Sequence, residues 1–123
     1  MEMIEENKLM RRLLGMPTHT DAEVLKDTIS LVSGFKWQDI ISRSRKGELA
    51  LARAMFCYVG TMRYGMHPSA ISSHIERDRT TVYHGVESVG DKLYVKSPLE
   101  TAMLKQINTI LDHVHNKQRT PID

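Results

Sequence analysis

Apolar residues recur at intervals of three or four along most of the chain, and this spacing predicts amphipathic helices. A first helix is expected over residues 3–14, with a break at Gly15–Pro17. Thr20 and Glu23 match an S/T-x-x-E capping box, which predicts that a second helix starts there and ends at Ser33–Gly34. The apolar positions of that second helix follow the helical period: Val24, Leu25, Ile29 and Val32.

The next segment predicts a short helical turn, a loop and a long helix. Trp37–Ile41 forms the turn, and the loop Ser44–Gly47 is basic and contains a glycine. The long helix is expected over about 48–63, and Gly65 stops it. One stripe of this helix is expected to be buried: Ala52, Met55, Phe56, Val59 and Met62.

Three further signals predict the remaining helices. Pro68 suits the first position of a short helix, and Asp78 is a favourable N-cap for the helix after it. A capping box with proline at the first helical position, residues 97–100, starts a last helix that runs to about 115. That helix is expected to bury Leu99, Met103, Ile107, Ile110 and Val114. No strand pattern competes, so the predicted fold class is all-α.

Composition fits one globular domain. The 123 residues are 41% hydrophobic and 26% charged, unlike a disordered chain. The single cysteine, Cys57, permits no intrachain disulfide, which fits a reducing compartment. No apolar run reaches the roughly 18 residues of a membrane span. We therefore expect a cytoplasmic protein with no membrane association.

Net charge is only +2, but the basic residues are unevenly distributed. Residues 2–6 carry three acids, whereas residues 43–53 carry one acid and four bases, namely Arg43, Arg45, Lys46 and Arg53. Arginines beside a helix-turn-helix commonly reach phosphates or a narrow minor groove. The alternative interpretation is a solvated basic turn.

A short helix, a tight link and a helix beginning at Asp78 follow the order of a helix-turn-helix. In such motifs the first residues of the second helix reach base edges in the major groove, here Asp78, Arg79, Thr80 and Thr81. The helix dipole disfavours Arg79 at that position by about 0.3–1 kcal/mol, and a phosphate or a guanine edge would offset this cost. The alternative is a plain capped helix with a solvated arginine.

Several segments together resemble the C-terminal DNA-binding domain of the bacterial chromosomal replication initiator DnaA family. The likeness covers roughly residues 28–114 and is most specific over 77–86, which read Arg77-Asp78-Arg79-Thr80-Thr81-Val82-Tyr83-His84-Gly85-Val86. The segment 39–45, the pair Ala52-Arg53 and Ile71 also match. The resemblance implies a small helical domain with a helix-turn-helix of the initiator type that binds a short duplex box.

The resemblance also implies a role for each matching residue. Arg45 would enter the minor groove and Arg53 would contact the DNA backbone, while His84 corresponds to a family histidine near that backbone. Base reading in the major groove would fall to Asp78, Arg79, Thr80 and Thr81. The remaining basic residues are grouped with the minor-groove and phosphate contacts: Arg43, Lys46 and Arg77.

Three positions depart from the family pattern. Ile75-Glu76 stands where the family has two glycines, with a link one residue shorter, and Arg79 stands where the family block has a histidine. No G-x-x-x-x-G-K-[ST] phosphate loop is present, so we expect no nucleotide, no cofactor and no enzymatic activity. The resemblance implies sequence-specific binding of double-stranded DNA by a free-standing module, in the initiation or regulation of replication.

The expected organisation is an N-terminal helical arm over 1–25, the DNA-binding domain over 26–116 and a frayed tail over 117–123. The arm matches nothing in the family, so a replication or regulatory protein partner that docks on it is an alternative. A helical protein-interaction module and a transcription regulator of a mobile element are competing interpretations of the whole chain. His113 and His115 would point about 200° apart on one helix, so we expect no metal site there.

Overall fold

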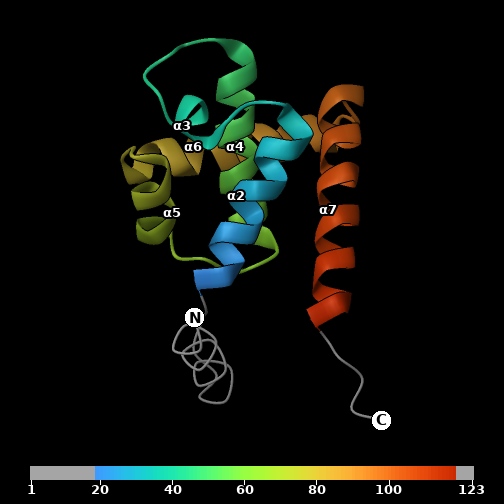
Figure 1. The fold of residues 1–123 in the computed structure, drawn as a ribbon. Helices are drawn as coiled ribbons and strands as arrows, with labels where there is room; N and C mark the ends of the chain where they lie inside the picture. The colour runs from blue at the N-terminus through green and yellow to red at the C-terminus, as the bar shows by residue number, and fades with distance from the viewer. Residues whose placement is uncertain (1–18, 119–123) are drawn as a thin grey trace.

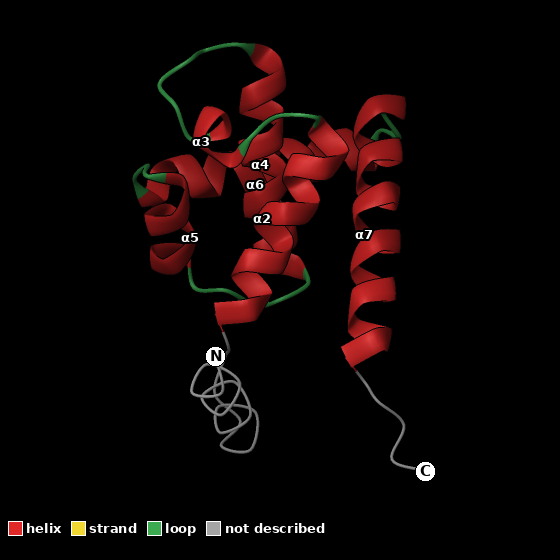
Figure 2. Ribbon diagram, in the orientation of Figure 1, coloured by secondary structure: helices red, strands yellow, loops and turns green. Residues whose placement is uncertain are grey.

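Helices account for every regular element in the described part of the protein. The computed structural model describes residues 19–118. Its helices are α2 (His19–Ser33), α3 (Trp37–Ile40), α4 (Gly47–Met62), α5 (Pro68–Ile75), α6 (Arg79–Tyr94) and α7 (Pro98–Gln118). Figure 2 shows only helices and loops over this range, and the predicted all-α class is confirmed.

Helix α4 lies at the centre and contacts α2, α3, α5 and α6, while α7 covers α2 and α6 from the opposite side to α5 (Figure 1). The core is formed by apolar residues from all of these helices, and Phe56 of α4 is its largest fully buried side chain. The other fully buried large residues are Leu25, Ile29, Ile40, Met55, Val59, Ile71, Ile75, Val82, Val89, Ile107 and Leu111. The core therefore joins the two helices of the predicted helix-turn-helix, α5 and α6, to α4.

The predicted helix starts at Pro68, at the Asp78 cap and at Pro98 are all confirmed. Helix α2 begins at His19, one residue before the predicted cap, and continues without a break past residue 25. The expected boundary between arm and domain thus falls inside α2, where Leu25 is fully buried. The helix predicted over 3–14 lies outside the described residues.

Two residues that were expected to be buried are exposed. Met62 is the last residue of α4 and is 64% exposed, and Leu99 is 62% exposed in the first turn of α7. Met62 lies at the very end of its helix, and Leu99 borders an open depression between α2, α4 and α7. Farther along α7, Leu111 takes the fully buried place that was predicted for Ile110.

Helix α6 approaches α4 closely at Gly85. A Cβ added there would lie 3.3 Å from the Cα of Ala54 and 3.3 Å from the Cβ of Cys57. The thiol of Cys57 is buried, and this burial raises its pKa to about 12, so it stays protonated and packs as an apolar group. The missing side chain at Gly85 therefore sets the distance between α6 and the central helix.

We predict that Gly85→Leu lowers the free energy of unfolding by about 1–3 kcal/mol, because the new side chain meets backbone that cannot yield without moving α6. Gly90→Ala is the matched control on the same helix, since its added Cβ makes only an ordinary contact with Tyr58 at 3.9 Å. It should raise stability by about 0.5–1 kcal/mol through helix propensity. Urea unfolding followed by circular dichroism measures both. Wild-type stability in Gly85→Leu would contradict the close approach.

Candidate nucleic-acid interface

The turn between α5 and α6 consists of residues 76–78 and has the geometry of a helix C-cap. The amide of Glu76 donates to the carbonyl of Ser73 at 3.4 Å, and the amide of Arg77 donates to that of Ser72 at 3.1 Å, which is the Schellman pattern. Glu76 adopts φ 55 and ψ 45, in the left-handed region. The turn thus keeps its shape at the position where the family pattern has glycine, although a side chain there costs about 1–2 kcal/mol.

Asp78 caps the N-terminus of α6. Its Oδ1 accepts a hydrogen bond from the amide of Thr81 at 2.9 Å and another from the hydroxyl of Thr81 at 3.0 Å. These bonds favour the ionised carboxylate and hold the pKa of Asp78 below its ordinary value. The cap leaves Arg79 and Thr80 exposed in the first turn of α6. The helix start is therefore fixed by a charged group that itself lies on the surface.

The loop between α3 and α4 carries the basic residues and makes its own hydrogen bonds. The hydroxyl of Ser42 donates to the carbonyl of Asp39 at 2.6 Å and accepts from the amide of Ser44 at 3.4 Å. Arg43 and Arg45 are exposed. Unlike these two arginines, Lys46 contacts an aromatic ring, since its ammonium lies over Phe35, 5.5 Å from the ring centroid.

Arg53, on the second turn of α4, reaches back to this loop. Its Nη1 donates to the carbonyl of Ile40 at 2.7 Å and to that of Ser42 at 3.4 Å, and its Nη2 donates to that of Ser44 at 3.3 Å. Partial burial is the main cause that lowers the pKa of Arg53, and the positive charge of Arg77 lowers it further. The guanidinium is thus engaged with the backbone of the basic loop.

Arg77, in the helix-turn-helix turn, binds the same loop from the other side. Its Nη2 donates to the carbonyl of Ser42 at 2.6 Å and its Nη1 to that of Ile41 at 3.1 Å. Nη1 also lies 3.2 Å from the carbonyl of Ile75 and 3.3 Å from that of Glu76. We call these contacts of Arg53 and Arg77 with the loop carbonyls the arginine bridge.

Half of the predicted DNA-binding residues lie together around the arginine bridge. One surface depression is lined by Arg43, Ser44, Arg45, Arg53, Glu76, Arg77 and Asp78. Four arginines face two acids there, so the depression is basic in balance. Arg79, Thr80 and Thr81 follow directly along α6. Lys46 is turned toward Phe35, and His84 lies one turn farther along α6 in a separate depression with Glu87, Ser88, Asp91 and Lys92.

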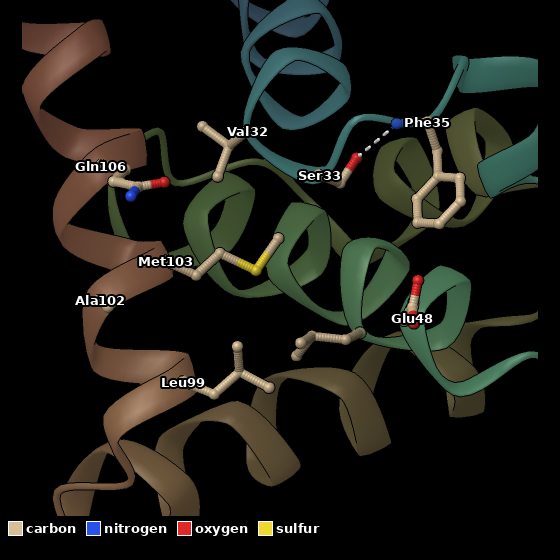
Figure 3. A pocket seen from close by; sticks show the side chains of 9 residues that line it. Val32, Ser33, Phe35, Glu48, Leu99, Ala102, Met103 and Gln106 are labelled. Carbon is tan, nitrogen blue, oxygen red and sulfur yellow. Dashed lines mark hydrogen bonds between the residues drawn. The ribbon is translucent and has the colours of Figure 1, made fainter.

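A second kind of surface lies between α2, α4 and α7 (Figure 3). Its lining is mostly apolar, with Glu48 as the one charged residue: Val32, Ser33, Phe35, Glu48, Leu51, Leu99, Ala102, Met103 and Gln106. Exposed Leu99 borders this depression, as Figure 3 shows. It contains no basic side chain and is therefore unsuited to a phosphate backbone.

The arginine bridge was not foreseen from the sequence, which suggested only that Arg53 and Arg77 contact DNA. Every acceptor in the bridge is a main-chain carbonyl. Because every residue carries one, no residue type in the sequence indicates which carbonyls accept these bonds. The left-handed conformation of Glu76 could have been predicted from the sequence, because Ile75-Glu76 stands where the family pattern has a glycine pair.

A model of the family described as the bacterial dnaA protein helix-turn-helix matches residues 22–89. The match runs from α2 through most of α6 and includes the loop, the turn and the cap described above. The chain belongs to this family. No curated protein and no solved structure matches it. Membership supports DNA binding in replication initiation, since the helix-turn-helix of this family is a DNA-binding module. Within residues 19–118 no helix is long and apolar enough to cross a membrane.

Substitutions at Glu76 should separate backbone strain from charge. Glu76→Gly relieves the left-handed strain, and the greater freedom of glycine in the unfolded chain offsets part of the gain, so the free energy of unfolding should rise by at most about 1 kcal/mol. Glu76→Val should lower it by more than about 1 kcal/mol, since β-branched residues are least tolerated there.

Glu76→Asn is the control, because asparagine tolerates the left-handed region and, like glycine, removes the negative charge. Chemical unfolding followed by circular dichroism ranks the three variants. Equal stability of the Val and Gly variants would mean that residue 76 does not hold a positive φ.

Proposed function

We propose that this chain binds double-stranded DNA with sequence specificity, and that its 123 residues do so without a nucleotide. The observation that carries the proposal is the juxtaposition of a capped, exposed start of α6 with a basic loop, joined through the arginine bridge. A recognition helix and a basic loop held side by side are suited to engage two grooves of one duplex.

For the major groove we propose Asp78, Arg79, Thr80 and Thr81 as the base-reading residues. Arg79 and Thr80 are exposed in the first turn of α6, and an arginine can give guanine two parallel hydrogen bonds. The hydroxyl of Thr81 donates a hydrogen bond to Oδ1 of Asp78. These two residues therefore present a preorganised polar edge, which supports base contacts beside those of Arg79 and Thr80.

For the DNA backbone and minor groove we propose Arg43 and Arg45 as the direct contacts, because their side chains are exposed and line the basic depression. Arg53 and Arg77 add positive charge to the same surface while their guanidiniums bind carbonyls. Lys46 and His84 would lie at the margins as weaker backbone contacts.

Selection of bound duplexes from a random library, with wild type beside Arg79→Ala at one salt concentration, tests the proposal. We expect wild type to enrich one motif and the variant to lose preference at a single position, with an affinity loss of about 1–3 kcal/mol on the selected duplex. The slope of log affinity against log salt should be about −4 to −5 if roughly four to six phosphates are neutralised.

Arg63→Ala is a matched control, because Arg63, which directly follows α4, pairs with Asp112 of α7 at 2.8 Å and is not among the residues that line the basic depression. It should leave the enriched motif unchanged. Equal losses for Arg79→Ala on selected and random duplexes would contradict base reading by Arg79. No enrichment by wild type would contradict sequence specificity itself.

A further inference from the structure

The arginine bridge connects the basic loop with the start of α6, the two elements that the proposed function assigns to different grooves. Arg77 belongs to the turn that leads into α6, and Arg53 belongs to α4. The carbonyl of Ser42, near the start of the basic loop, accepts from both guanidiniums, at 2.6 Å from Arg77 and 3.4 Å from Arg53. The neighbouring carbonyls of Ile40 and Ile41 each accept from one of them.

The two connected elements differ in what holds them. Helix α6 is fixed by its own packing, because Val82 and Val89 are fully buried against the core. The loop over 41–46 has no regular structure, and its Arg43 and Arg45 are exposed. The side-chain hydrogen bonds within the loop join residues two or three apart and do not tie it to α4 or α6. The guanidiniums of Arg53 and Arg77 supply the hydrogen bonds that tie it to α4 and to the turn before α6.

We propose that Arg77, together with Arg53, is a positioning residue for DNA recognition. It holds the loop that carries Arg43 and Arg45 at a constant offset from the start of α6, so that the loop and Arg79 meet a single DNA site in register. The proposal rests on the proposed function and refines it. It assigns the guanidinium of Arg77 to loop carbonyls, whereas the resemblance grouped Arg77 with the direct DNA contacts.

Guanidinium chemistry distinguishes this role from a phosphate contact. The guanidinium is a planar fork with five donors, which lets Arg77 bond the carbonyls of Ile41, Ser42, Ile75 and Glu76 at once. A lysine carries the same charge on one compact ammonium and cannot span them. Arg77→Lys should therefore preserve attraction to phosphate and lose the Arg77 part of the bridge, which ties the loop to the turn before α6.

A double-mutant cycle on the selected duplex tests the proposal, with full-length protein throughout. Arg45→Ala and Arg77→Lys are each expected to weaken binding about tenfold. The affinity of the double variant should also fall only about tenfold, because Arg45 no longer contacts the duplex when the loop is not positioned. On random duplex Arg77→Lys should change affinity by no more than about twofold, since the charge is kept.

Arg79→Ala provides the matched cycle. The double variant Arg77→Lys/Arg79→Ala should lose about a hundredfold in affinity, which is the product of the two single losses. The losses multiply because α6 is held by the core and not by the bridge. Arg63→Lys controls for the replacement of an arginine whose partners are side chains, Asp112 and Asn108, and should bind as wild type does. Thermal unfolding of each variant checks folding, and Arg53→Lys takes the place of Arg77→Lys if the latter does not fold.

Multiplicative losses for Arg45→Ala with Arg77→Lys would overturn the positioning role, as would wild-type affinity in Arg77→Lys. Both results leave the enrichment of a duplex by wild type intact, so they are distinct from a failure of the proposed function. If the proposed function fails, wild type selects no duplex, and the positioning role is then contradicted as well.

Discussion

The carbonyl oxygen of Ser42 is the point on which the geometry of the candidate interface depends. It accepts hydrogen bonds from Arg53 of α4 and from Arg77 of the helix-turn-helix turn. Two like charges close together are unfavourable unless acceptors compensate them, and main-chain carbonyls on both sides supply that compensation here. The basic loop is thereby tied to α4 and to the helix-turn-helix turn by side chains of those elements, and its own arginines remain exposed.

The rest of the fold supports this junction. Helix α4 carries Arg53 on the side toward the loop and buries Met55 and Phe56 in the core, so the guanidinium starts from a rigid base. Gly85 lets α6 lie against α4, and the cap at Asp78 sets where that helix begins. A chain with a net charge of only +2 can in this way present a locally basic surface without a large overall charge.

The sequence predicted the helices well because their starts carry strong local signals, such as Pro68 at a first helical position, Asp78 as a cap and the 97–100 capping box. It predicted burial less well at helix ends, as Met62 and Leu99 show, because periodicity marks the apolar face of a helix but not whether another element covers it. The residues of the basic depression could be named in advance. Their hydrogen-bond partners could not, because tertiary contacts with main-chain carbonyls leave no trace in residue type.

The central claim is that the start of α6 and the basic loop meet one DNA site together, in different grooves. Dimethyl sulfate probing of the selected duplex measures this most directly, because it modifies guanine N7 in the major groove and adenine N3 in the minor groove. The account predicts protection in both grooves within one site, with loss of only the minor-groove protection in Arg45→Ala. Protection confined to one groove, or unaffected by Arg45→Ala, would contradict it.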